Sequence, residues 1–378
     1  MAEALSAVVV GAGWAGEGHT RALRHHGVEV VAICARREEA ARALALRLGV
    51  AGASGDWRRT LREVRPGIVG IATPAAVRGD VVAEAVAHGS DIFCDKPLAL
   101  SAEDAAGMYQ AVHAAGVHHA YAATYQYDPS VAWMAEMVRE GRIGRLQALD
   151  LSMRSALGTG IAPWSWNLNP AEGGGVLNNG FTHALGTLAR ICGGPALRVT
   201  GDTVMRAVRA PVVPGLADFR AWQSTRLTPQ EAQGLEWREG AIERRYRALL
   251  VFACGELEVP ATVTWDAGPA APWPANGLRL LGDEGTIVAV DRGYGVYDVG
   301  LVRPGAEVAA PLSVPARLAA TDPDAADPVQ SRWNALARDF VADIRGEAHA
   351  PYPTFLDGWR QQVAIDTVRG SGGWVTLP

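Results

Sequence analysis

Lysine is almost absent from this sequence of 378 residues, because it occurs once, at Lys96, among 35 basic residues whose other members are all arginine. Arginine-rich codon usage that left one lysine by chance is one interpretation. The other is that arginine cannot replace Lys96, because a compact ammonium with an adjustable pKa differs chemically from a guanidinium that stays charged. The scarcity of lysine therefore makes Lys96 a candidate site residue.

Cysteine is also scarce, and its spacing excludes two classes of protein. The four cysteines stand at positions 34, 94, 192 and 254 and never form a CxxC pair. Neither a structural zinc site nor a disulfide framework is indicated, and such free thiols favour a cytoplasmic location. The paired histidines at 25–26 and 118–119 have no carboxylate at ligand spacing, so no metal site is predicted.

Long hydrophobic runs and a strong net charge are missing as well. The first apolar run, residues 5–10, is far too short to cross a bilayer and follows no basic segment of the kind that begins an export signal. The net charge of −5 supplies no field that would attract nucleic acid or anionic lipid. A hydrophobic fraction of 49% is that of a folded protein. We therefore predict a soluble globular protein with neither a nucleic acid nor a membrane partner.

Short apolar segments alternate with helical patterns in the N-terminal part of the chain. Strands are predicted where Val and Ile cluster between Gly or Pro, at residues 7–10, 29–34, 68–72, 91–94 and 117–124. Helices are predicted where apolar residues recur at helical spacing, at residues 19–26, 38–48, 56–64, 77–88 and 101–115. Such alternation is typical of a parallel sheet with helices on both faces. We predict an α/β Rossmann dinucleotide-binding domain over residues 1–123.

The remaining residues, 124–378, contain mostly strand patterns. Strands are predicted at 146–153, 197–205, 248–253, 257–265, 277–281 and 286–290, and helices at 130–140, 331–344 and 355–369. This pattern predicts a C-terminal α+β domain with a large, mostly antiparallel open sheet. The polar residues 206–247 predict an excursion or lid that interrupts the sheet, and the Pro-rich residues 303–328 predict a loop.

A glycine-rich turn follows the first predicted strand and opens a helix. It consists of Gly11, Ala12, Gly13, Trp14, Ala15 and Gly16. In a GxGxxG motif the first glycine allows a tight turn, the second lets the backbone approach a pyrophosphate, and the third lets the helix pack on the strand. A glycine-rich turn without a ligand is the alternative, but the strand and helix around the motif favour a dinucleotide site. We therefore predict that these residues bind the cofactor.

The end of the second predicted strand distinguishes NADP from NAD. An acidic residue at this place would bind the ribose 2′-hydroxyl of NAD, whereas the sequence has Arg36 and Arg37. Guanidinium groups offer charge-assisted hydrogen bonds to a 2′-phosphate, and Arg36 can also stack on adenine. The sequence therefore favours NADP over NAD. The alternative is that both arginines are solvated residues at the start of a helix.

Further motifs follow the glycine-rich turn in a specific order. They are His19, then Thr73 and Pro74, then Asp95, Lys96 and Pro97, and then three glycines at 173–175 that lead to His183. In this order and spacing the chain resembles the glucose-fructose oxidoreductase, inositol dehydrogenase and rhizopine catabolism family (Gfo/Idh/MocA). The resemblance implies NAD(P)-dependent oxidation or reduction of a sugar or cyclitol hydroxyl. It also implies cofactor contacts by Thr73, Pro74 and Asp95, and an open sheet face that often makes oligomer contacts, so a homodimer or homotetramer is expected.

The resemblance also implies roles for individual residues at the chemical site. Lys96 is placed near the nicotinamide and the reacting oxygen, with Asp95 where a glutamate is usual. His183 takes the acid/base position, and Asn179 stands where the family commonly has aspartate. An ammonium can stabilise a developing alkoxide, and a neutral imidazole can accept the alcohol proton. A satisfied buried histidine is the alternative for His183, and helix capping is the alternative for Asn179.

Several residues around the expected substrate pocket depart from the family's pattern. Ala75 and Arg78 stand where the family often has asparagine and histidine, and in the Tyr125-Gln126 pair Gln126 replaces a frequent arginine. Phe181 and Gly186 replace a usual glycine and acid. Because these departures surround the substrate pocket, the resemblance is a weaker guide to the substrate than to the cofactor. Tyr125, Gln126 and Asn179 are nevertheless our candidates for contacts with the substrate.

Two tryptophans just before the three glycines are candidate platforms for a sugar ring. The C–H face of a sugar can pack on the indole of Trp164 or Trp166 while Asn167 or Asn169 bonds its hydroxyls. Packing in the core is the alternative for both indoles.

The sequence as a whole predicts an NADP-preferring oxidoreductase that acts on a secondary hydroxyl or ketone of a sugar, glycoside or cyclitol. A non-catalytic NAD(P)-binding regulatory or sensor protein is the main alternative, since the amide of Asn179 cannot ionise as a carboxylate does. An imine or tetrapyrrole reductase is a third possibility.

Overall fold

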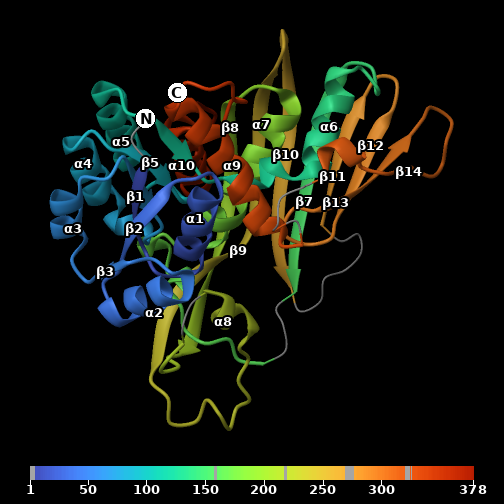
Figure 1. Ribbon diagram of the computed structural model, residues 1–378. Coiled ribbons are helices and arrows are strands. Elements are labelled where there is room, and N and C mark those ends of the chain that lie inside the picture. Colours follow the sequence, from blue (N-terminus) through green and yellow to red (C-terminus); the bar gives the residue numbers. More distant parts are fainter. Residues whose placement is uncertain (1–4, 157–159, 217–218, 269–275, 320–323, 325) are drawn as a thin grey trace.

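The computed structural model describes residues 5–156, 160–216, 219–268, 276–319, 324 and 326–378. Figure 1 shows a parallel sheet with its helices next to a larger sheet, with helices between the two. The smaller sheet has six strands in the order β3-β2-β1-β4-β5-β6, and the larger has nine in the order β14-β13-β12-β11-β7-β10-β9-β8-β15.

The six-stranded sheet confirms the predicted Rossmann fold, since each pair of neighbouring strands is parallel. Its elements are β1 (Ser6–Val10), α1 (Trp14–His25), β2 (Glu29–Cys34), α2 (Glu38–Leu48), β3 (Gly52–Ser54), α3 (Trp57–Val64), β4 (Ile68–Ile71), η1 (Ala75–Val77), α4 (Arg78–Ala87), β5 (Asp91–Cys94), α5 (Ala102–Ala115) and β6 (His119–Tyr121). The strand order reverses between β1 and β4, and open α/β sheets bind ligands at the carboxyl ends of the strands at such a point. The turns after β1, β4 and β5 meet there.

The nine-stranded sheet confirms the predicted C-terminal α+β fold with a large, mostly antiparallel sheet. Its pairs are antiparallel except for β7 with β10, which run parallel. The elements of this part are η2 (Thr124–Tyr127), α6 (Pro129–Arg139), β7 (Leu146–Ala156), η3 (Trp166–Leu168), η4 (Pro170–Glu172), η5 (Leu177–Phe181), α7 (Thr182–Cys192), β8 (Ala196–Pro211), α8 (Phe219–Ser224), β9 (Trp237–Cys254), β10 (Leu257–Gly268), β11 (Gly277–Gly282), β12 (Thr286–Asp291), β13 (Tyr297–Val302), β14 (Ala310–Leu312), η6 (Ala316–Leu318), α9 (Pro328–Ile344), α10 (Phe355–Arg369) and β15 (Val375–Thr376).

The prediction of an excursion over residues 206–247 is wrong at both ends. β8 continues to Pro211 and β9 begins at Trp237, and the two strands stay paired along this length. The paired ends form a two-stranded ribbon that extends below the rest of the molecule in Figure 1. Most of its side chains are at least partly exposed on both faces, so the sequence shows charged residues without the alternation of a half-buried strand. Of the described residues in this stretch, those at 212–216 and 219–236, which include α8, leave the ribbon.

The predicted loop at 303–328 contains regular structure as well. β14 lies within it and pairs with β13. The sequence analysis predicted neither of these two strands. β14 has three residues and lies at the edge of the sheet, so it lacks the length on which a pattern-based prediction depends.

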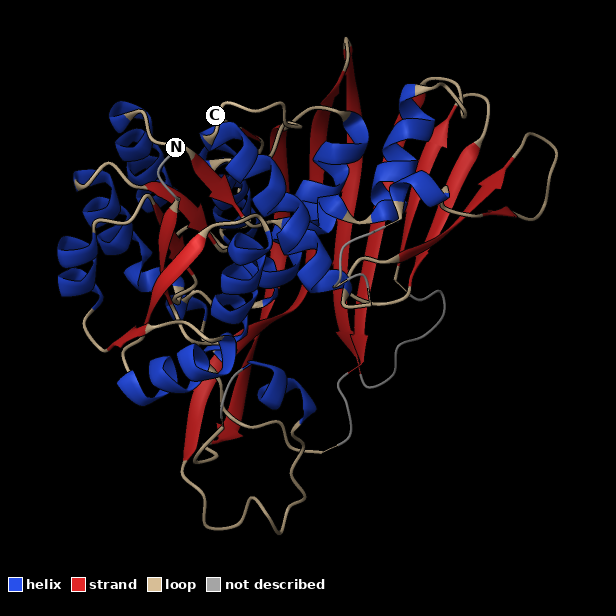
Figure 2. Cartoon of the chain, viewed as in Figure 1, coloured by secondary structure: helices blue, strands red, loops and turns tan. Residues whose placement is uncertain are grey.

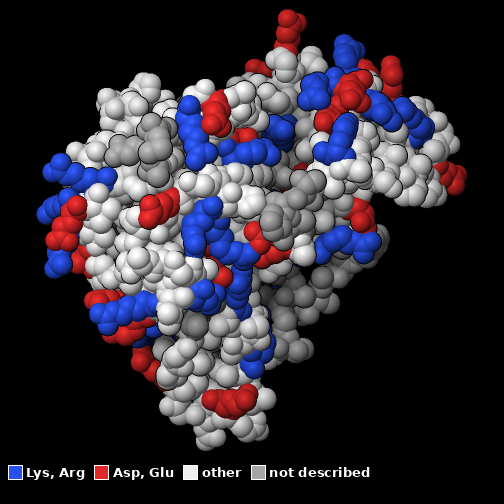
Figure 3. Space-filling view, viewed as in Figure 1, with Lys and Arg blue, Asp and Glu red and all other residues white. Residues whose placement is uncertain are grey.

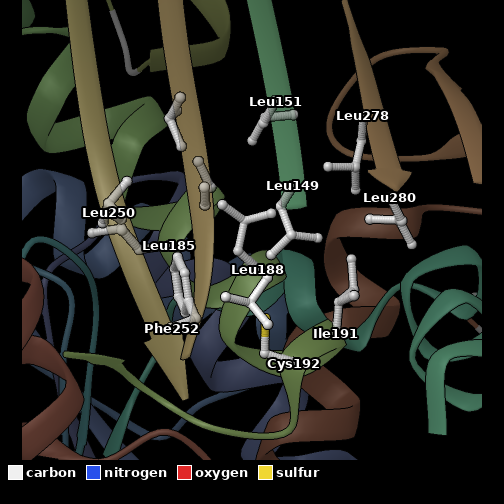
Figure 4. Close-up of a cluster of buried hydrophobic side chains, with 14 of the residues drawn as sticks. Leu149, Leu151, Leu185, Leu188, Ile191, Cys192, Leu250, Phe252, Leu278 and Leu280 are labelled. Carbon is white, nitrogen blue, oxygen red and sulfur yellow. The ribbon is translucent and has the colours of Figure 1, made fainter. Parts of the chain in front are cut away.

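Helices α6, α7 and α10 pack on one face of the nine-stranded sheet, and Figure 2 shows helices in front of that sheet. Figure 4 shows Leu185, Leu188 and Ile191 of α7 against Leu149 and Leu250 of the sheet. Burying one leucine stabilises a fold by about 1.5–3 kcal/mol. Because α7 buries three such side chains here, it is a firm support for His183 at its beginning.

The closing helices link the C-terminal part to the Rossmann sheet. Trp333, Leu336 and Phe340 of α9 belong to the same buried cluster as β1 and α1. The proposed domain division near residue 123 falls just after β6, so α9 returns across it. Figure 3 shows acidic and basic side chains interspersed on the face in view. Within the described residues, no helix is both long and apolar enough to span a membrane.

Candidate active site

The glycine-rich turn after β1 has the geometry of a dinucleotide site. Gly11 has a φ of +128°, and a Cβ at this position would overlap the carbonyl group of Ala72. A Cβ at Gly16 would overlap the carbonyl oxygen of Gly11. Gly13, in contrast, is exposed and would place a Cβ in open space. Two glycines thus allow strand and helix to pack closely, and the third leaves free the surface that a pyrophosphate would approach.

Other groups around this turn fit a bound dinucleotide. Gly13 is the N-cap of α1 and provides no side-chain cap, so the start of the helix keeps its positive end open. The hydroxyl Oγ1 of Thr73, in the turn after β4, is buried and has no hydrogen-bond partner among the described residues. Thr73 is followed by Pro74, which is exposed. The residues present therefore fit an NAD(P) cofactor at the switch point of the sheet.

The indole of Trp14 points toward the C-terminal part of the chain. It stacks on Phe219 of α8, with ring centroids 5.7 Å apart, and meets Trp333 of α9 edge-on at 5.5 Å. The guanidinium of Arg220 lies 5.2 Å from the centroid of the Trp14 ring. The side chain of Trp14 thus anchors α8 against the glycine-rich turn, which leaves the main chain of Trp14 and Ala15 as the part that would face a cofactor.

Arg36 and Arg37 follow the end of β2. Both side chains are exposed, and Arg37 is the N-cap residue of α2. Their place at the carboxyl end of β2 is where a Rossmann fold receives the adenosine ribose.

The amine of Lys96 is directed into the site and not into solvent. Its Nζ donates to Oδ1 of Asn179 at 2.9 Å and lies 3.4 Å from the main-chain oxygen of the same residue. Burial lowers the pKa of Lys96 to about 8, with Arg78 lowering it further and Asp95 opposing the change. An amine with a pKa this close to neutrality can both hold and release a proton during turnover.

Asn179 lies in the π-helical turn η5, which leads directly into α7. Its Nδ2 donates to the carbonyl oxygen of Gly175 at 2.9 Å and to Oδ1 of Asn167 at 3.1 Å. These two bonds turn Oδ1 toward Lys96. The capping alternative for Asn179 is wrong, because η5 has no side-chain cap and the Asn179 amide donates to carbonyls instead of accepting from helix N–H groups.

His183 lies one turn further along the same helical segment. Its ring stacks on that of Tyr125, with centroids 3.8 Å apart and planes 9° from parallel. The guanidinium of Arg332 lies 4.9 Å from the Tyr125 ring centroid and forms a buried ion pair with Asp128. Burial lowers the pKa of His183 well below its usual value, and the charges of Lys96 and Arg332 lower it further. The imidazole is therefore neutral at pH 7 and able to accept a proton.

The remaining predicted substrate residues, Gln126, Trp164 and Trp166, have different surroundings in the structure. Gln126 donates to the carbonyl oxygen of Ala123 at 2.9 Å, so its amide already has a partner within the protein. The ring of Trp164 packs on Gly240 of β9. Trp166 precedes Asn167, whose side chain bonds Asn179, so η3 lies beside the site.

Asn167 and Asn169, the predicted partners of sugar hydroxyls, each have hydrogen bonds within the protein. Oδ1 of Asn167 accepts from Asn179, as described above. Asn169 accepts from the N–H of Ala171 and donates to Glu172. The bond from Asn179 to Asn167 is a contact that the sequence analysis did not foresee.

Glu243 is a further residue that sequence reasoning missed. This fully buried carboxylate accepts from the N–H of Val176 at 2.6 Å and from Arg369 at 3.3 Å. A Cβ on Gly175, which has a φ of +92°, would lie 2.6 Å from the same carboxylate. Glu243 thus holds the turn that leads to Asn179 and His183. The available signal was weak, because Glu243 falls within the stretch that was predicted as an excursion.

The fold and this site define a dinucleotide-binding oxidoreductase of two sheets. Residues 5–122 match the family model described as "Oxidoreductase family, NAD-binding Rossmann fold", and residues 131–288 match that of the "GFO/IDH/MocA C-terminal domain". The chain therefore belongs to the Gfo/Idh/MocA oxidoreductase family, as the resemblance predicted.

Named relatives include two dehydrogenases of carbohydrates and cyclitols. Levoglucosan dehydrogenase of Pseudarthrobacter phenanthrenivorans is 32% identical over 156 residues, which are 39% of this chain and 38% of that protein. Inositol 2-dehydrogenase of an Arthrobacter species is 33% identical over 161 residues, which are 41% of this chain and 47% of that protein. The matched segments thus cover less than half of either relative.

A solved structure shares the whole architecture. The structure of levoglucosan dehydrogenase in complex with NADH and levoglucosan covers 99% of each chain with a TM-score of 0.75. At 21% sequence identity this likeness shows the fold alone.

Proposed function

We propose that the chain is an NADP-preferring oxidoreductase that moves hydride between the nicotinamide and a secondary hydroxyl or ketone of a sugar, glycoside or cyclitol. The observation that carries this proposal is the bond between the Lys96 amine and Asn179, one helical turn before the neutral imidazole of His183. Lys96 follows the carboxyl end of β5, and Asn179 and His183 come to it from η5 and α7. The names of the two relatives support the same class of substrate.

The residues divide the chemistry of alcohol oxidation between them. The bound nicotinamide supplies the hydride acceptor. Nζ of Lys96 donates to the substrate oxygen and stabilises the negative charge that develops when the C–H bond breaks. The imidazole of His183 accepts the hydroxyl proton, and Tyr125 holds the plane of that ring. In the reverse direction His183 returns the proton while Lys96 polarises the ketone.

The proposed assembly is a homodimer or homotetramer formed through the open face of the nine-stranded sheet. Two apolar side chains on strands of this sheet, Val204 of β8 and Leu249 of β9, are 40% and 48% exposed and are available for such a contact. Light scattering of the purified chain measures the oligomeric state directly.

Turnover with a panel of sugars and cyclitols tests the proposed function, with reduced nicotinamide followed by absorbance. We expect oxidation of at least one compound with NADP, and His183→Asn to lower kcat by about 10²–10⁴-fold, the usual contribution of a general base. Binding of the cofactor to His183→Asn, measured by calorimetry, should be unchanged. Tight NADP binding without turnover of any compound would overturn the proposal in favour of a sensor. A sensor is expected to change conformation when its ligand binds and to leave that ligand chemically unchanged.

Arg36→Asp tests the proposed preference for NADP. The variant should bind NADP about 10–10²-fold more weakly, because a hydrogen bond to a charged group contributes about 1.5–3 kcal/mol. Its affinity for NAD should stay the same or rise, since a carboxylate at this place accepts from the 2′-hydroxyl. Calorimetric titration with both cofactors measures the two affinities. An unchanged affinity for NADP would show that Arg36 is a solvated residue, and Arg198→Asp, on the other sheet, is the control.

A further inference from the structure

Arg78 is a buried cation between two turns of the active site. It is the first residue of α4, and only 3% of its surface is exposed. Its guanidinium donates to the carbonyl oxygen of Thr73, at 3.0 Å from Nε and 2.7 Å from Nη2. The same group donates to the carbonyl oxygens of Asp95 at 2.5 Å, Lys96 at 3.2 Å and Pro97. One side chain thus joins the turn after β4 to the turn after β5.

This arrangement needs a guanidinium. Its five N–H donors lie in one plane and can serve several carbonyl oxygens at once, whereas an ammonium or an imidazole offers fewer donors. A buried charge is costly unless hydrogen bonds surround it. The carboxylate of Asp95, 3.9 Å from Nη2, is its nearest acidic partner. The guanidinium of Arg78 is therefore stabilised mainly by main-chain oxygens, and its hydrogen bonds in turn fix the two turns that carry these oxygens.

The consequence concerns Lys96. Three consecutive carbonyl groups, those of Asp95, Lys96 and Pro97, are held by one side chain, so the main chain that carries the amine is fixed at its base. Only the four methylene groups of the lysine then separate this anchor from the bond to Asn179. Charged or titratable groups near the amine are Asp95 and Arg78 on the Rossmann side and His183 on α7.

We propose that Arg78 is a positioning residue that holds the Lys96 ammonium opposite Asn179 by binding the carbonyl groups of the turns after β4 and β5. The inference rests on the proposed function and deepens it. It also accounts for one departure from the family's pattern, since arginine stands here where a histidine is frequent.

Two variants separate positioning from charge and from stability. Arg78→Lys keeps the positive charge but loses most of the hydrogen bonds, and Arg78→Met loses both. We expect each to lower kcat by about 10²-fold, the size of effect that a misplacement of about 1 Å produces. The alkaline limb of the pH profile of kcat should also move upward from about pH 8. Asp80→Asn is the matched control, because it removes an exposed ion pair with Arg58 from the first turn of the same helix.

A second measurement follows the amine without any turnover. Because Lys96 is the only lysine of the wild type, acetylation at a series of pH values followed by mass spectrometry reports its titration alone, with the terminal amine as an internal reference. In Arg78→Lys, peptide masses after digestion separate the label on Lys96 from the label on the lysine introduced at position 78. The wild-type midpoint should lie near the pKa of about 8, and the midpoint in Arg78→Lys should move toward about 10.4, the value for a solvated lysine.

The outcomes are distinct. A midpoint and kcat in Arg78→Lys that match the wild type would overturn the inference, because charge alone would then account for the contribution of Arg78. A lower melting temperature with an unchanged midpoint and pH profile would overturn it as well, since the role would be purely structural. If the wild type shows no turnover but the midpoint still shifts in Arg78→Lys, the proposed function fails while the positioning of Lys96 stands. If Arg78→Met does not fold, Arg78→Lys carries the test.

Discussion

We expect the replacement of Lys96 by arginine to lower kcat for oxidation of the substrate hydroxyl by about 10³-fold, within the range of about 10²–10⁴ for acid–base groups. The variant keeps the positive charge, so loss of charge is not the cause. A planar guanidinium is larger than the ammonium that bonds Oδ1 of Asn179 at 2.9 Å, and it does not release a proton near neutral pH. Steady-state rates at saturating NADP and substrate measure the effect.

The pH profile of the same variant carries the sharper signature. In the wild type we expect kcat to fall as pH rises through about 8, because burial lowers the pKa of Lys96 to about 8 and the ammonium loses its proton there. A guanidinium stays charged, so the residual activity of Lys96→Arg should have no alkaline limb near this pH. The acidic limb should lie well below pH 6.5 in both proteins, since the lowered pKa of His183 keeps its imidazole neutral above that range.

Arg198→Lys, an exposed exchange between the same two residue types on β8, is the control and should change neither kcat nor its pH profile. Were Lys96→Arg to retain the wild-type kcat, the single lysine would be explained by codon usage and the proposed role of Lys96 would be wrong.

The Rossmann half of the fold was predictable because its strands are short, apolar and separated by helices of clear period. β2 and β5 have the predicted bounds, and both are largely buried. β3 was missed, since its sequence Gly-Ala-Ser contains no large apolar residue. Pairing with β2, and not its own composition, makes this segment a strand.

The β8–β9 ribbon was not predictable from periodicity. Its strands have solvent on both faces beyond the helices, so neither face required apolar residues. Glu243 lies on this ribbon at an irregularity in the pairing, where β8 shifts register between Val204 and Met205. A buried carboxylate among charged neighbours has no distinct sequence signal, although Glu243 accepts from the main chain of the turn before α7.

The candidate site was predicted as a set of motifs but not as a set of contacts. The resemblance selected Lys96 and His183 by their spacing, and the structure joins their surroundings through Asn179. The stack of His183 on Tyr125 involves residues far apart in the chain, and Arg332 reaches the same stack from α9. Such contacts depend on the position of the two sheets relative to each other, and a local sequence pattern does not predict that position.

Two glycines of the same turn should differ in how a single added methyl group changes the stability of the protein. Gly16→Ala should destabilise the protein by more than the usual cost of overpacking, about 1–3 kcal/mol, because the Cβ meets the rigid main-chain oxygen of Gly11 and not a movable side chain. Displacing α1 from β1 also misplaces the start of the helix, so binding of NADP should be lost. Chemical denaturation and calorimetry measure the two effects.

Gly13→Ala is the matched variant because its Cβ enters open space. The free energy of unfolding without cofactor should stay within about 1 kcal/mol of the wild type, since Gly13 has extended φ and ψ angles that alanine also adopts. Affinity for NADP should nevertheless fall at least about tenfold, or about 1.4 kcal/mol, because the methyl group occupies the surface that the pyrophosphate approaches. Unchanged NADP binding in Gly13→Ala would mean that the phosphates lie elsewhere, and the assignment of this turn as the cofactor site would then fail even if Gly16→Ala unfolds as expected.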